Sequence, residues 1–152
     1  MSNHKLGLVV TGENVVGVVL DFDITPPAVQ GQFTWSLQAG DRVDALAVMY
    51  DRVVNFVREE HIAEVVLKAS AAGRTVTVKH LGSAELRGVV AVASKTGGAT
   101  VQLIQKAVVS RTFGERNADE YVGDNSFWDT AVSGDVLKTR REAAFLLLAA
   151  KG

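Results

Sequence analysis

Short apolar runs and one alternating segment, both typical of β-strands, make up the N-terminal part of the chain. Two valine-rich segments, residues 6–10 and 15–20, flank the sequence Thr-Gly-Glu-Asn, which is typical of a β-hairpin. Residues 32–37 then alternate with a period of two, the pattern of a strand that buries one face. Three antiparallel strands are therefore expected at the start of the chain.

A helical period replaces this alternation after Asp41. Apolar residues recur every three or four positions from Val43 to Val57, with charged residues between them, and this spacing predicts an amphipathic helix. Asp41 is placed to cap its first turn. Residues 64–68 follow with a short apolar run that predicts a buried central strand.

The second half of the chain predicts two more helices and one more strand. Residues 75–78 suit a short strand or an extended loop, and Ser83 is placed as the N-cap of a helix that ends in a glycine cap at Gly97. Residues 99–104 predict a strand, and the last helix is expected from Ser133 or Asp135 onward. The predicted order is β-β-β-α-β-α-β-α.

Residues 106–135 are the least regular part of the chain, but they carry aromatic side chains that a disordered segment would lack. Two of these, Phe127 and Trp128, suit either of two roles. They could stack on exposed nucleic-acid bases, or they could anchor an irregular loop by burial. The second role is the commoner use of such residues.

Composition narrows the expected class of protein. The chain has 152 residues, 47% of them hydrophobic, and only 2 prolines, so one domain over residues 1–152 without a linker is expected. The absence of cysteine excludes disulfides and thiolate chemistry and favours a cytoplasmic location. The apolar run at residues 143–150 is far shorter than the roughly 20 residues that span a bilayer, so no membrane association is expected.

Three local strings resemble the RuvC-type Holliday-junction resolvase family. They are LGLVVTG at residues 6–12, LGSAELRGVV at residues 81–90 and REAAFLLLA at residues 141–149, which resemble the opening strand, the helix after the central strand and the closing helix. The resemblance implies an α/β ribonuclease-H-like fold with a mixed five-stranded sheet flanked by helices. It also implies a symmetric homodimer, formed through the helix near residues 83–95 or through the first helix.

The same resemblance implies four acids that hold two Mg²⁺ ions for phosphodiester cleavage. The matching positions here are Val9 or Val10 on the first strand, Lys68 at the end of the central strand, and Thr139 and Glu142 at the last helix. Only Glu142 is acidic. An ammonium group would repel a divalent ion, so we expect a Lys68–Glu142 ion pair in its place; the alternative is that Lys68 simply ends a strand at the surface.

Other candidate catalytic groups lack a recognisable motif. Asp21 and Asp23 could serve as displaced metal ligands, although acids that lead into a Pro-Pro turn usually face solvent. His4, His61 and His80 show no metal-binding spacing and no paired nucleophile. We therefore assign no metal site from the sequence.

Basic residues point to a different function. The net charge is −1, yet residues 61–152 contain twelve Lys or Arg against nine acids. Cations alone can hold phosphate groups without any cleavage chemistry. The candidate nucleic-acid-binding residues are Arg74, Lys79, Arg87, Lys106, Arg111, Lys138, Arg140 and Arg141.

The leading hypothesis is a non-catalytic RuvC-like protein, without a cofactor, that binds junction or branched nucleic acid or a protein partner. One alternative is a divergent Mg²⁺-dependent nuclease that combines Glu142 with Asp21, Asp23 or an acid of residues 106–135. The other is an interaction or inhibitor protein with no nucleic-acid role. A divalent-ion cleavage assay separates the first two hypotheses.

Overall fold

A five-stranded mixed sheet forms the centre of the computed structural model, which describes residues 3–70, 77–106 and 113–150. The strands are β1 (His4–Thr11), β2 (Asn14–Asp21), β3 (Ala28–Ser36), β4 (Ile62–Lys68) and β5 (Thr100–Ile104), in the spatial order β3-β2-β1-β4-β5. The first three pair antiparallel, and β4 and β5 join in parallel. The predicted mixed five-stranded sheet is confirmed.

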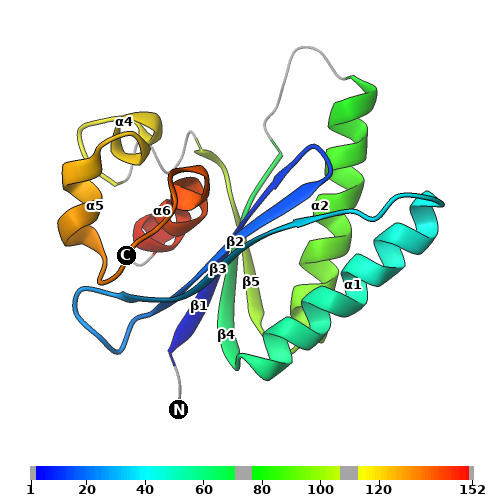
Figure 1. The fold of residues 1–152 in the computed structure, drawn as a ribbon, viewed down its shortest axis with the longest axis horizontal. Coiled ribbons are helices and arrows are strands. Elements are labelled where there is room, and N and C mark those ends of the chain that lie inside the picture. The colour runs from blue at the N-terminus through cyan, green and yellow to red at the C-terminus, as the bar shows by residue number, and fades with distance from the viewer. Residues whose placement is uncertain (1–2, 71–76, 107–112, 151–152) are drawn as a thin grey trace.

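Helices cover both faces of this sheet (Figure 1). One face carries α1 (Arg42–Glu59) and α2 (Val78–Thr96), and the other carries α4 (Ala118–Val122), α5 (Asn125–Ala131), the 3₁₀ turn η1 (Lys138–Arg140) and α6 (Arg141–Ala150). Within the described ranges, no helix is long and apolar enough to cross a membrane.

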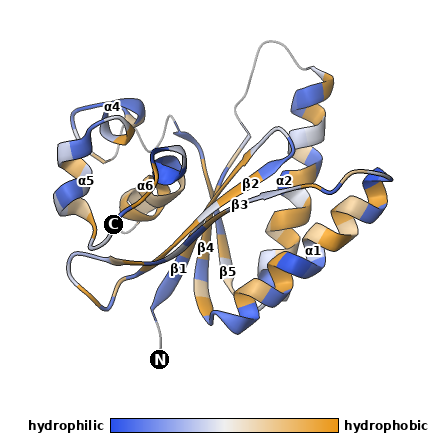
Figure 2. Cartoon of the chain, viewed as in Figure 1, coloured by the Kyte–Doolittle hydropathy of each residue, from blue (hydrophilic) through white to orange (hydrophobic). Residues whose placement is uncertain are grey.

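Two separate hydrophobic cores lie on the two faces. Leu6, Leu8 and Val10 of β1 pack in the core beneath α1 and α2, whereas Val9 packs in the core beneath α6. Because β1 is buried on both faces, it needs apolar residues at successive positions and not at alternate ones. This explains the valine-rich runs of β1 and β2, which are coloured as hydrophobic over much of their length in Figure 2.

The start of α1 is as predicted, and the start of α2 is not. The Asp41 carboxylate accepts a hydrogen bond from the Asp44 amide at 2.9 Å and caps α1. Helix α2 begins at Val78 with Thr77 as its cap, so the prediction of Ser83 as N-cap is wrong. The first turn of α2 carries the exposed Val78, and its core-facing period therefore starts only at the buried Ser83.

Residues 75–78 do not form a separate strand in the described part, because Val78 already belongs to α2; Thr75 and Val76 lie outside the described residues. The last helix also begins later than predicted, at Arg141 and not at Ser133 or Asp135. Leu137 suggested the earlier start, but its side chain is exposed. Leu137 therefore precedes α6 and does not belong to the buried apolar face of that helix.

The irregular region is organised by an aromatic cluster. Phe113, Tyr121 and Phe127 surround the buried ring of Phe145 on α6, with ring centroids 4.7 to 6.3 Å from that of Phe145. Trp128 is 5% exposed, and its indole N–H donates to the Tyr121 carbonyl at 3.0 Å. The anchoring role for these aromatic residues is therefore the one that the structure supports.

Candidate functional site

The C-terminal ends of the parallel strands β1 and β4 bring the central candidate residues together. Leu8 and Leu67 are register partners in these strands, so Val9 and Lys68, one residue further along each, lie at the same level. Lys68 is in turn paired with Ile104 of β5. These side chains share the sheet face that α6 covers, because Val9 and Ile104 both belong to its core.

The structure shows which of the two first-strand candidates, Val9 or Val10, faces Glu142. Val9 is 4% exposed in the core beneath α6, on the side where Glu142 approaches. Val10 points to the opposite face, and its carbonyl oxygen accepts a hydrogen bond from Arg87 at 3.4 Å. Val9, and not Val10, therefore shares a sheet face with Lys68 and Glu142.

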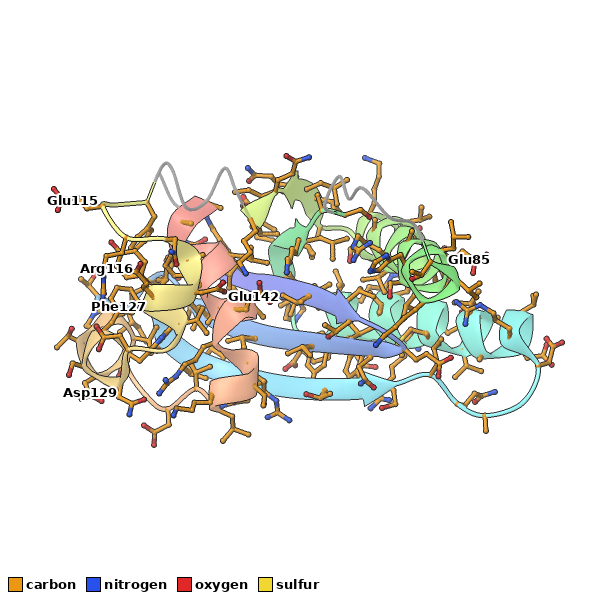
Figure 3. All side chains as sticks on the ribbon, turned by 90° about the horizontal axis from the view of Figure 1, so that it is seen from above. Glu85, Glu115, Arg116, Phe127, Asp129 and Glu142 are labelled. Atoms are coloured by element: carbon orange, nitrogen blue, oxygen red, sulfur yellow. The ribbon has the colours of Figure 1, made fainter. Side chains whose placement is uncertain are left out.

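Lys68 and Glu142 form the expected ion pair. The Lys68 Nζ lies 2.8 Å from Glu142 Oε2, and the two side chains are 24% and 28% exposed. Glu142 stands in the first turn of α6 where that helix lies against the strands (Figure 3). A short contact between opposite charges that are largely shielded from water is stronger than an exposed pair.

Thr139 does not join this pair. It lies on η1, one turn before Glu142, with an exposed side chain. Its hydroxyl group forms no hydrogen bond with the other residues that the structure describes. The four matching positions thus consist of a buried valine, an ammonium, a carboxylate and an exposed hydroxyl.

This set of side chains does not fit a pair of divalent cations. Two such ions need several carboxylate ligands, whereas the site contains the Glu142 carboxylate alone, already bound to an ammonium. In the described ranges, no three His, Asp or Glu residues, the three candidate histidines included, form a group that could hold a metal ion.

The displaced acids do not complete the site either. Asp21 pairs in register with His4 at the start of β1, the opposite end of that strand from Val9. Its carboxylate accepts from the Asp23 amide at 2.9 Å and lies 3.8 Å from the His4 ring. The structure therefore places Asp21 at the end of β2 and Asp23 in the turn that follows, apart from Glu142.

Two acids of the irregular region are also engaged locally. Asp119 lies 2.7 Å from the Lys106 ammonium, and Asp124 accepts from Arg116 at 3.0 Å. The hydrogen bond from Arg116, supported by the Phe127 amide, lowers the pKa of Asp124 below its ordinary value. Asp119 thus links α4 to Lys106 after β5, and Asp124 caps α5.

No protein-family model and no curated protein sequence matches this chain, but solved structures do. The structure of T. thermophilus RuvC in complex with Holliday junction substrate matches 98% of this chain and 94% of its own, with a TM-score of 0.71 and 10% identity. A second Thermus thermophilus RuvC structure matches with a TM-score of 0.69 and 12% identity, over 97% and 95% of the two chains. The chain has the RuvC-type ribonuclease-H-like fold.

Three of the candidate basic residues of this RuvC-like fold lie near the ends of the central strands. Lys79 is exposed at the start of α2 beside the β1–β2 turn, with its Cε 3.7 Å from the position that a Cβ on Gly12 would take. Lys106 follows β5 and is 40% exposed. The Arg87 guanidinium is held internally by the Val10 carbonyl and the Ser70 hydroxyl, and burial lowers its pKa.

The other described candidates lie at the start of α6. Lys138 is exposed, and Arg140 donates to Thr34 Oγ1 of β3 at 3.3 Å. Arg141 donates to Asn125 Oδ1 at 2.9 Å and to the Val122 carbonyl at 3.3 Å, so it holds α5 against α6. Arg74 and Arg111 lie outside the described residues.

The structure therefore divides the basic candidates by use. Arg87 and Arg141 are committed to internal hydrogen bonds. Lys106 is ion-paired with Asp119 and is 40% exposed, whereas Lys79 and Lys138 are exposed. One internal contact that the sequence did not reveal is made by Arg42, which bonds the Gly82 carbonyl at 3.0 Å and Glu85 at 3.2 Å. Its partners lie about forty positions away, so no local pattern marks it.

The strength of the Lys68–Glu142 pair can be measured by a double-mutant cycle. We expect Lys68→Met and Glu142→Gln to show a coupling of about 1–2 kcal/mol in urea unfolding, because both groups are partly buried. The more exposed Lys106–Asp119 pair is the control, and it should couple by less than about 1 kcal/mol. Equal coupling in the two pairs would contradict a special role for Lys68.

Proposed function

We propose that this chain is a RuvC-like domain that binds structured nucleic acid, such as a four-way junction, without cleaving it. The observation that carries the proposal is the Lys68–Glu142 ion pair at 2.8 Å, in the row of positions where the resemblance implies metal-binding acids. The ammonium supplies one positive charge at a place where a nuclease of this type needs divalent ions.

The side chains available as metal ligands support the proposal that the chain does not cleave. Cleavage of a phosphodiester by two metal ions requires ligands for both, and Val9, Lys68 and Thr139 offer no carboxylate. The alternative of a rearranged nuclease loses support, because Asp21 and Asp23 lie at the other end of β1. The chain would then bind the nucleic acid without cleaving it.

The binding part of the proposal rests on the fold and on exposed cations. A RuvC with the same fold has been solved with a Holliday junction substrate. Lys79 and Lys138 are exposed, and Lys106, which is paired with Asp119, is 40% exposed. Phosphate contacts require only cations at suitable separations. The proposal includes a cytoplasmic location, in keeping with the absence of cysteine.

A homodimer is also part of the proposal. Val78 and Leu81 on the first turns of α2 are 86% and 56% exposed, and apolar side chains that stand out in this way on one helix suit an isologous contact. A dimer would bring two sets of the three lysines to one branched ligand.

The test is a binding titration at low salt with labelled four-way junction, duplex and single strand, in EDTA. We expect the junction to bind, with an affinity that falls steeply as salt rises. The triple variant Lys79→Glu, Lys106→Glu, Lys138→Glu should weaken binding more than about tenfold and reduce the salt slope by about 2 to 3. Lys95→Glu, at the other end of α2 from Lys79, is the matched control and should leave binding unchanged.

Two results would overturn the proposal. Absence of binding to all three nucleic acids at low salt would remove the nucleic-acid role and favour a protein partner. Cleavage with Mg²⁺ or Mn²⁺ that is abolished by Glu142→Gln would establish the nuclease alternative.

A further inference from the structure

Strand β5 ends the sheet on the side away from the hairpin. The amide of Ala69 donates to the Ile104 carbonyl at 2.8 Å, so the backbone groups of Ile104 point toward β4. Because this direction alternates along a strand, the N–H and C=O groups of Val101 and Leu103 point outward. None of the described residues forms a backbone hydrogen bond with these outward groups.

The opposite edge of the sheet is covered along the first part of β3. On β3, the Val29 amide donates to the Ser133 carbonyl at 2.9 Å. The Gln32 side chain bonds the Asp135 carbonyl at 2.8 Å and accepts from the Leu137 amide at 3.0 Å. Strand β5, with the sequence TVQLI, has no charge and no proline, the residues that usually protect an open edge.

A groove lies between β5 and α2, beside this open edge. Its volume is about 560 Å³, and it is lined by Ala91, Val92, Lys95, Thr96, Val101 and Leu103. Val92 is 59% exposed and Leu103 is 58% exposed. The two residues of β5 that line the groove are the same two whose backbone groups point outward.

This coincidence fits an added strand better than a compact ligand. A peptide that pairs with β5 would satisfy the outward backbone groups, and every second side chain would enter the groove. The groove is lined by the apolar residues Val92, Val101 and Leu103, so the peptide side chains that enter it should be apolar.

The charges at one end of the groove indicate which residue a bound peptide should carry there. Lys95 is exposed and forms no ion pair with the rest of the described chain, and no carboxylate lines the groove. Arg58 donates to the carbonyl of the lining residue Thr96 at 3.4 Å, which brings a second cation to the same end. An acidic residue of the occupant would be attracted there.

We infer that the β5–α2 groove docks an extended segment of a partner protein that has apolar residues at alternate positions and an acid at the end near Lys95. The inference does not depend on nucleic-acid binding, because none of the three lysines of that proposal lines the groove. It gives the chain a second, protein-binding surface.

The probe is a labelled octapeptide of alternating valine and threonine with aspartate at both ends. We expect saturable binding to the full chain, with Leu103→Lys weakening it by more than about tenfold, since a buried leucine contributes about that much. Lys95→Glu should weaken the aspartate peptide and favour a version that carries lysine at both ends. Val43→Lys, at an exposed apolar position on α1 outside the groove, is the control and should change nothing.

Amide hydrogen exchange locates the peptide on the edge. In the free protein, the Val101 and Leu103 amides should exchange quickly and those of Gln102 and Ile104 slowly, and the peptide should slow the first two. Failure of the octapeptide to bind would overturn the inference. So would equal binding of a version that is N-methylated at alternate residues. Protection of the Val101 and Leu103 amides in the free protein that Leu103→Lys abolishes would also overturn it, because it would identify a second copy of the chain as the occupant of the groove.

Discussion

Replacing Lys68 with glutamate is expected to make the stability of this protein depend on divalent cations. The substitution removes the ammonium 2.8 Å from Glu142 and sets a second carboxylate beside it. Without metal, the free energy of unfolding should fall by about 2–4 kcal/mol, because a partly buried charge loses its partner and gains a like charge. Millimolar Mn²⁺ or Mg²⁺ should restore it, since two carboxylates can ligate one ion.

The measurement is thermal unfolding of wild type and Lys68→Glu with EDTA, Mg²⁺ or Mn²⁺. If the ion is present at about one hundred times its dissociation constant, the gain is about 2.7 kcal/mol, or roughly 5–10 °C in Tm. Wild type should not respond. Lys106→Glu beside Asp119 is the matched control; since that pair is more exposed, both the loss and the rescue should be smaller. A variant that is as stable as wild type in EDTA would show that Lys68 and Glu142 do not interact in solution.

Replacing Gly7 with alanine should separate α6 from the sheet. A Cβ at Gly7 would lie 2.0 Å from the Ala143 carbonyl oxygen and 3.1 Å from Leu147 Cγ. The nearest atom belongs to the helix backbone, so a side-chain rotation cannot relieve the overlap. We expect a loss of about 3 kcal/mol or more, at or above the upper end of typical overpacking costs.

Urea unfolding of Gly7→Ala tests this expectation, with Gly31→Ala as control. Gly31 lies on β3, and a Cβ there would meet no atom within 4 Å. The control should be neutral or slightly stabilised. Since α6 carries Glu142, Gly7→Ala should also reduce the coupling between Lys68 and Glu142. Equal stability of the two variants would mean that α6 is not docked as closely as described.

Local patterns predicted most of the elements, because apolar periodicity depends on which residues are buried in each segment. The hairpin, the third strand, α1 with its Asp41 cap, β4 and β5 all follow from such patterns. The errors fall at helix starts. Thr77 and Ser83 are both good capping residues, and only the packing of α2 shows which of them begins the helix.

The candidate site was predictable in part. The ion pair joins two residues 74 positions apart, and it was expected through the family resemblance and not from spacing. The choice between Val9 and Val10 could not be made from the sequence, since a shift of one residue in a strand moves a side chain to the other face. Likewise, nothing local distinguishes Arg87 and Arg141, which bind internally, from the exposed lysines.

The sequence by itself determined the α/β order, the absence of thiol chemistry and the shortage of acids at the matching positions. These depend on residue type and local periodicity. The tertiary structure alone decided that Val9 shares a face with Lys68 and Glu142, and that β5 is an open edge beside α2. Both are consequences of strand order and helix placement, which are set by long-range packing and which no local pattern encodes.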